Sequence, residues 1–200
     1  MSYRNWKTLH EDCQACAKCD LARYRTHMVF GEGNIHADIM LIGEGPGRVE
    51  DETGRPFVGP SGQLLDELLG GIGLRRSDVF IANVVKCRPP GNRDPKPEEI
   101  EACFPYLRAQ LALVKPKIIV CLGVHAARLV LRRDVRITRE HGSVHHVKSF
   151  TIIPTYHPAA LLHNPPNKPL AEADFQIIGQ EVRRLAADEA QSGDGALLRQ

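Results

Sequence analysis

The chain has 200 residues, of which 42% are hydrophobic, 25% charged and 6% aromatic, and its formal net charge is +2. These values fit a single globular domain and exclude collagen-like, coiled-coil and disordered chains. The charge neither requires nor forbids a nucleic-acid partner. No apolar run approaches the roughly 20 residues of a membrane span, and the first residues lack an apolar signal region, which predicts a cytoplasmic protein without membrane contact.

Short apolar runs alternate with helical patterns after a polar, Cys-rich beginning. Buried strands are expected at residues 38–43, 79–85, 118–122 and 150–154. Helices are expected at residues 61–69, with Ser61 as N-cap, and at 97–114, 123–131 and 170–185. Residues 1–187 are expected to form one domain, and the small, polar residues 188–200 are expected to be a disordered tail.

This alternation predicts an α/β fold with a parallel sheet covered on both faces. In such sheets, ligands bind beyond the carboxyl ends of the strands. Three segments follow strand ends here and carry polar residues that a plain connection would not need: 44–47, 83–88 and 156–163.

Six cysteines without an export signal point to metal or redox chemistry rather than to disulfides. Cys121 lies within an apolar strand and is expected to be a core residue. The others are Cys13, Cys16, Cys19, Cys87 and Cys103, from which a four-thiolate site can be assembled. Zinc and an iron–sulfur cluster both accept four thiolates, and the absence of paired histidines favours the cluster.

Two glycine loops resemble nucleotide-binding motifs but lack essential parts. Pro46 interrupts the first loop, so the dinucleotide spacing fails. Pro60 stands where a phosphate loop requires lysine. Acids and one aromatic residue gather around these loops instead: Glu44, Glu50, Asp51 and Phe57.

Taken together, five segments resemble the family 4 uracil-DNA glycosylases, the iron–sulfur type of the uracil-DNA glycosylase superfamily. They are residues 29–33, 43–51, 54–59, 83–90 and 157–162, in the order found in the family. The resemblance implies a three-layer α/β/α sandwich around a four-stranded parallel sheet. It also implies a [4Fe–4S] cluster held by Cys16, Cys19, Cys87 and Cys103, which would dock the segment 10–25. Cys13 falls outside the ligand pattern, although ligation by Cys13 stays an alternative.

The implied activity is DNA repair: hydrolysis of the N-glycosidic bond of deoxyuridine in single- or double-stranded DNA, releasing free uracil. A base inside a duplex must be flipped out for this chemistry. By the resemblance, Asn83 reads the uracil edge, Phe57 stacks on the ring, and His157 donates to uracil O2. Gly45 belongs to the loop against the substrate.

By analogy with glycoside hydrolysis, a carboxylate is expected to position the attacking water and to stabilise the positive charge that develops on the sugar. Glu44 and Glu50 are both candidates, and Glu50 can alternatively crowd the base at C5 and so reject thymine. The sequence does not separate these roles.

DNA contacts are expected from basic residues in or beside the site loops and from an apolar wedge. The basic residues are Arg55, Lys86, Arg88, Arg93, His163 and Lys168. Leu161 or Leu162 would fill the space left by the flipped base. Many relatives carry arginine at the position of His163.

Two other function classes fit parts of the pattern. A uracil-DNA capture protein would bind without turnover, but the loop 86–93 contains no histidine for a covalent adduct. An iron–sulfur redox protein would leave Asn83, Phe57 and His157 unexplained. No family role places a lysine amine at the sugar, so a monofunctional enzyme is expected. Nothing in the sequence suggests an obligate oligomer, so we expect a monomer, and its implied function would place it at the nucleoid.

Overall fold

The computed structural model describes residue 3 and residues 5–197. This part of the chain forms one six-stranded sheet with the order β1-β3-β2-β4-β6-β5. The strands are β1 (Glu32–Gly33), β2 (Ile39–Gly43), β3 (Phe80–Asn83), β4 (Ile118–Leu122), β5 (His145–Val147) and β6 (Phe150–Thr155). The four central strands are parallel, as the apolar runs predicted.

The prediction of a four-stranded sheet is wrong in strand number. β1 and β5 are short strands that pair antiparallel with β3 and β6 at the two edges. Neither edge strand is an apolar run, because each is only partly buried, and so the hydrophobic pattern gave no sign of them.

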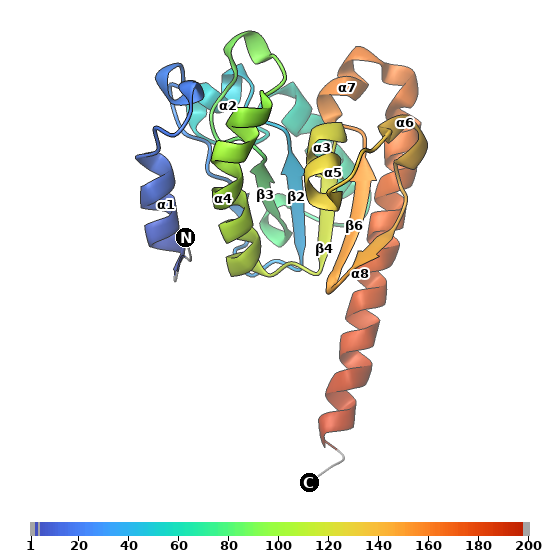
Figure 1. The fold of residues 1–200 in the computed structure, drawn as a ribbon. Coiled ribbons are helices and arrows are strands. Elements are labelled where there is room, and N and C mark those ends of the chain that lie inside the picture. Colours follow the sequence, from blue (N-terminus) through green and yellow to red (C-terminus); the bar gives the residue numbers. More distant parts are fainter. Residues whose placement is uncertain (1–2, 4, 198–200) are drawn as a thin grey trace.

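Helices cover both faces of the sheet, which confirms the three-layer arrangement (Figure 1). They are α1 (Trp6–Gln14), α2 (Arg48–Thr53), α3 (Pro60–Gly70), α4 (Pro97–Val114), α5 (Val124–Leu131), α6 (Ile137–Glu140), α7 (Pro158–His163) and α8 (Lys168–Leu197). Met40 and Ile42 of β2 belong to the core on the side of α1, α4 and α5, whereas Ile39 and Leu41 belong to the core of α3 and α8. Both faces of this strand are therefore buried, as expected for a central parallel strand.

The Cys-rich beginning, which lacks periodicity, nevertheless forms the helix α1. The Asn5 side chain accepts a hydrogen bond from the Thr8 N–H and caps the helix. Trp6 contacts Phe30 and Phe80 edge-to-face, with ring centroids 5.2 and 5.1 Å apart. Aromatic packing thus fixes this segment against the sheet, in addition to anything its cysteines bind.

Two predicted helix ends are also corrected. The N-cap of α3 is Gly59 rather than Ser61, because Pro60 takes the first helical position, which its fixed φ suits. α8 continues to Leu197, so most of the predicted disordered tail, 188–200, is helical, and only its last three residues lie outside the described part.

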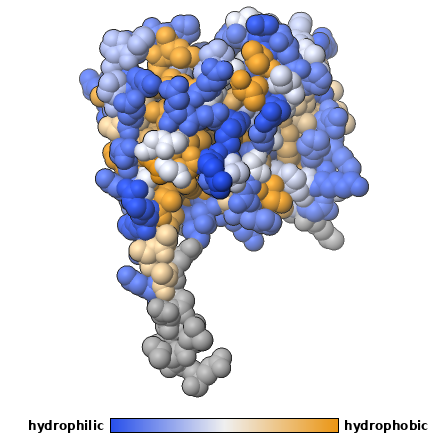
Figure 2. Space-filling model, turned by 180° about the vertical axis from the view of Figure 1, so that it is seen from behind, coloured by the Kyte–Doolittle hydropathy of each residue, from blue (hydrophilic) through white to orange (hydrophobic). Residues whose placement is uncertain are grey.

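On the face turned away from the viewer in Figure 1, hydrophobic side chains form separate patches among hydrophilic ones (Figure 2). The large exposed hydrophobic residues are Tyr24, Ile35, Val147, Leu162 and Leu170, which come from different parts of the chain. None of the described helices has the length and apolar character needed to cross a bilayer.

Candidate functional site

A cleft of about 550 Å³ opens at the carboxyl ends of β2, β3 and β6, as expected for a parallel sheet. It brings together most of the predicted site residues. Those that line it are Glu44, Gly45, Glu50, Phe57, Asn83, Arg93, His157 and His163. Its volume lies within the range of small-molecule binding sites.

Asn83 ends β3 with its side chain buried, and its Oδ1 atom has no hydrogen-bond partner among the described residues. A buried polar atom without a partner is destabilising and calls for an explanation. Gly43 on β2 faces it, and a Cβ at that position would collide with Asn83 Oδ1 and with the Phe57 ring. Glycine at position 43 therefore allows the Asn83 amide and the Phe57 ring to approach the backbone of β2 closely.

His157 is the N-cap of α7, and its Nδ1 accepts a hydrogen bond of 3.1 Å from the Ala159 N–H. This bond fixes the tautomer, so that Nε2 carries the proton and is free to donate. Burial lowers the pKa of His157 to about 4, an effect that Glu50 opposes. The imidazole is therefore a neutral donor at physiological pH.

Phe57 lies in the loop between α2 and α3, and its ring centroid is 5.5 Å from that of His157. Its φ of 50° is in the left-handed region, which costs about 1 to 3 kcal/mol for a residue with a bulky side chain. A Cβ on Gly62 would collide with the Phe57 carbonyl, so a glycine there is required by this loop conformation. Such strain persists only where surrounding contacts hold it.

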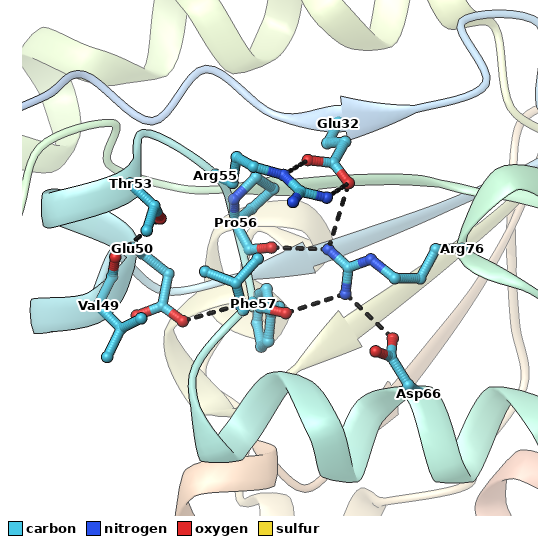
Figure 3. Close-up of polar contacts among 10 residues, drawn as sticks. Glu32, Val49, Glu50, Thr53, Arg55, Pro56, Phe57, Asp66 and Arg76 are labelled. Carbon is cyan, nitrogen blue, oxygen red and sulfur yellow. Dashed lines mark hydrogen bonds and ion pairs between the residues drawn. The ribbon is translucent and has the colours of Figure 1, made fainter.

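Glu50 supplies part of that support. Its Oε1 accepts hydrogen bonds from the Val58 N–H (3.0 Å) and the Gly59 N–H (2.8 Å). The carboxylate is nearly buried and therefore depends on these donors. One oxygen of Glu50 is thus engaged in holding the loop that carries Phe57 (Figure 3).

Glu44 has a different environment at the rim of the cleft. Its Oε2 lies 3.7 Å from His125 Nε2, and Asp94 Oδ2 lies 3.3 Å from the same nitrogen. Desolvation raises the pKa of Glu44, with His125 opposing and Asp94 adding to the rise. Sequence reasoning missed His125 and Asp94, because neither belongs to a recognisable motif and only the fold brings α5 beside the loop after β2.

The predicted DNA-contacting residues are not all available for that role. Lys86 is 1% exposed, and its Nζ donates to the Asn83 carbonyl (2.8 Å) and to Gln110 Oε1 (2.6 Å). The prediction that Lys86 contacts DNA is therefore wrong, since its amine points into the protein. Leu161 is also wrong as a wedge, because it is 2% exposed in the core, whereas Leu162 is 46% exposed.

The remaining basic residues differ in their partners. Arg55 forms two bonds with Glu32, of 2.7 and 2.8 Å, and Arg93 forms two with the buried Glu99. Arg88 donates to Asn92 Oδ1, and Lys168 pairs with Glu67 at 3.0 Å. His163 is exposed at the cleft.

A second, smaller pocket is lined by the cysteines. Cys13, Cys16, Cys19, Cys87 and Cys103 all border it, while Cys121 is buried in β4 as predicted. The Arg25 guanidinium donates to Cys87 Sγ, and the Lys86 backbone N–H donates to Cys103 Sγ, both at 3.3 Å. Donors to sulfur of this kind are common around iron–sulfur clusters.

The spacing of these sulfurs also bears on what they hold. Four thiolates around one zinc ion lie about 3.8 Å apart, given a Zn–S bond of roughly 2.3 Å. Across the described chain, three metal-binding side chains with ligand atoms within 4.8 Å of one another occur only at Glu44, Asp94 and His125. In the part of the chain that the structure describes, no three of the cysteine sulfurs therefore lie as close together as the ligands of one zinc ion do.

Comparison with known proteins agrees with this geometry. The model of the Uracil DNA glycosylase superfamily matches residues 30–180. A Type-4 uracil-DNA glycosylase of Archaeoglobus fulgidus is 48% identical over an alignment of 177 residues, which covers 84% of this chain and 89% of that protein. A Type-4 uracil-DNA glycosylase of Thermotoga maritima is 48% identical over an alignment of 160 residues that covers 79% of this chain and 83% of that protein. A Type-5 uracil-DNA glycosylase of Pyrobaculum aerophilum is 31% identical over an alignment that covers 86% of this chain and 88% of that protein.

Proposed function

The chain belongs to the uracil-DNA glycosylase superfamily and, within it, to the type-4 uracil-DNA glycosylases, and we propose that it excises uracil from DNA by flipping the base into the cleft. The observation that carries this proposal is the unpartnered Oδ1 of Asn83, a residue that lines the same cleft as the Phe57 and His157 rings. The glycosidic bond is out of reach inside a duplex, so the nucleotide must leave the stack.

Asn83 reads the base. Its Oδ1 accepts the N3–H of uracil, and its amide nitrogen donates to O4. Cytosine has an acceptor at N3 and an amino donor at the 4-position. The Oδ1 acceptor of Asn83 would then face another acceptor, and its amide N–H donor would face another donor. Phe57 stacks on the ring, which is worth about 1–3 kcal/mol for a base on an aromatic side chain.

His157 stabilises the leaving group. The base departs as an anion, and the Nε2–H of the neutral imidazole donates to O2 as the negative charge develops there. A donor aimed at developing charge in a closed site is worth about 3–4 kcal/mol. The hydrogen bond from the Ala159 N–H keeps the proton on Nε2, where this step needs it.

Glu44 positions the attacking water and stabilises the positive charge on the sugar. Glu50 is less suited, because its Oε1 already accepts two backbone N–H groups. Among the described residues no backbone N–H donates to the Glu44 carboxylate, and Glu44 lines the cleft beside Gly45. The raised pKa of Glu44 means that the carboxylate forms at a higher pH than for an ordinary glutamate.

The product is an abasic site in an intact strand. Strand cleavage by a glycosylase needs an amine that attacks the sugar. None of the cleft-lining residues in the described chain is a lysine, and the Lys86 amine is bonded elsewhere. Arg88, His163 and the exposed Leu162 contact the DNA around the flipped nucleotide.

Cys16, Cys19, Cys87 and Cys103 would hold a [4Fe–4S] cluster, whose contribution is structural cross-linking rather than chemistry at the base. The ligands come from the N-terminal segment, the loop after β3 and α4. They fix the position of the loop that leads from Asn83 to Arg88.

The test is single-turnover release from an oligonucleotide with one uracil, compared with matched thymine and cytosine oligonucleotides. Uracil release, with strand cleavage only after alkali, is the expected result. Tight binding without release would replace the proposal with a capture function. Strand cleavage without alkali would contradict the monofunctional mechanism.

A further inference from the structure

Arg76 lies outside the cleft, in the 3₁₀ turn η2 (Arg76–Asp78) before β3, yet it is bonded to the loop that carries Phe57. Its Nη2 donates to the Pro56 carbonyl at 2.7 Å, and its Nη1 donates to the Phe57 carbonyl at 2.9 Å (Figure 3). Two consecutive carbonyls are thus held by one planar group, whose donors have a fixed relative direction.

These bonds act on the strained residue itself. A φ of 50° at Phe57 turns its backbone away from the extended and helical regions. On one side of the loop, Glu50 accepts the N–H groups of Val58 and Gly59. On the other side, Arg76 donates to the carbonyls of Pro56 and Phe57. Four hydrogen-bonding groups from the three consecutive peptide units around Phe57 are therefore held by two side chains.

The positive charge of Arg76 is also paired with carboxylates of the protein. Asp66 lies 3.1 Å from Nη1, and Glu32, which pairs with Arg55, lies 3.8 Å from Nη2. The side chain is 22% exposed. A guanidinium with two acidic neighbours and two carbonyl acceptors is poorly placed to bind a phosphate, so its contribution to the reaction must be made through the loop.

We propose that Arg76 is a positioning residue for uracil excision: it holds the Phe57 backbone in the left-handed conformation that keeps the aromatic ring against the base. This inference rests on the proposed function, since it assigns the support of the stacking surface. It predicts that loss of Arg76 impairs the step after DNA binding, because the DNA backbone is held by other residues.

The experiment compares Arg76→Met with Arg75→Met in the full-length, cluster-loaded protein. Arg75 is the matched control, since it is 81% exposed and pairs with Asp78. We expect Arg76→Met to lower the single-turnover rate at saturating DNA about 10-fold or more, with KM changed less than about 3-fold. Arg75→Met should match the wild type. Arg76→Lys, which can keep one carbonyl bond, should recover part of the rate.

A double-mutant cycle with Phe57→Leu separates positioning from general stability. If Arg76 acts through the ring, Arg76→Met should lower the rate less than about 3-fold in the Phe57→Leu background. Asp66→Asn removes one of the two ion pairs of Arg76 and leaves the two acceptor carbonyls in place, and it should lower the rate less than Arg76→Met does. If Arg76→Met does not fold, Arg76→Lys is used in the same cycle.

Three results would overturn the inference: a normal rate in the folded Arg76 variants, an equal loss with and without Phe57, or a loss confined to KM. Failure of the wild type to release uracil would instead refute the proposed function. The two failures are therefore distinguishable.

Discussion

The cleft and the cysteine pocket adjoin the two ends of one short loop, since Asn83 ends β3 and Cys87 follows four residues later, but they are organised differently. In the cleft, hydrogen bonds within the protein already position the functional groups. In the cysteine pocket, the described sulfurs form no disulfides, and no three of them lie within 4.8 Å of one another. The cleft is preorganised by protein contacts, whereas we propose that the cysteine pocket depends on the cluster that it would hold. Substitutions in the cleft should therefore alter the rate of uracil release, and substitutions in the cysteine pocket should alter the stability of the fold.

The largest effect should come from the two polar groups of the cleft. Asn83→Ala and His157→Ala should each lower single-turnover uracil release about 100- to 1,000-fold, because each removes a bond that strengthens as charge develops. Thermal unfolding should stay within a few degrees of the wild type. If Asn83→Ala or His157→Ala lowered Tm as much as the cysteine variants do, the contrast between a cleft that sets the rate and a cysteine pocket that sets stability would be contradicted.

Cys87→Ser should lose iron, colour and stability together, with Tm lowered by roughly 5–10 °C. Cys13→Ala is the matched control, because Cys13 borders the same pocket but is outside the predicted ligand set. It should keep full iron content. If Cys13→Ala loses its iron and Cys16→Ala keeps it, Cys13 rather than Cys16 is a cluster ligand. Full activity of a variant without iron would contradict the proposed structural role of the cluster.

The pH profile sharpens the assignment of Glu44. Its pKa is raised, so the base form is lost as pH falls through a value above that of an ordinary glutamate. The wild-type rate should therefore fall on the acid side with unit slope. In Glu44→Gln the rate should be lower but flat down to about pH 5, because His157 gains its proton only near its pKa of about 4. An unchanged acid limb in Glu44→Gln would assign the limb to another group.

The smallest effect concerns the neighbouring leucines of α7. Leu162→Ala should slow release about 3- to 10-fold from duplex DNA and little from single strands, with no change in Tm, because the exposed side chain only fills the space of the flipped base. Leu161→Ala should instead lower stability by about 2–5 kcal/mol through a core cavity. An equal effect of Leu162→Ala on release from duplex and from single-stranded DNA would contradict the wedge role of Leu162.

Much of the fold was predictable because the central strands are buried on both faces and are continuous apolar runs. The edge strands β1 and β5 were not, since their pairing depends on neighbours distant in the sequence. The continuation of α8 was missed because the small, polar residues after 188 carry no apolar stripe.

For the site, the motif residues meet in one cleft as expected, but three features depend on tertiary contacts alone. Lys86 is a lysine after an apolar strand, and only the position of Gln110 on α4 explains its burial. His125 approaches Glu44 from α5. Arg76 reaches the Phe57 loop from a turn where the sequence shows two adjacent arginines with nothing to distinguish them.

The central claim is that the unpartnered Asn83 Oδ1 is the acceptor for the uracil N3–H. The direct measurement is single-turnover release from oligonucleotides carrying deoxyuridine or N3-methyldeoxyuridine, with wild type and Asn83→Ala. The wild type should release N3-methyluracil at least about 100-fold more slowly than uracil, and Asn83→Ala should lose most of that discrimination. Equal release of the two bases by the wild type, or undiminished discrimination in Asn83→Ala, would contradict the claim.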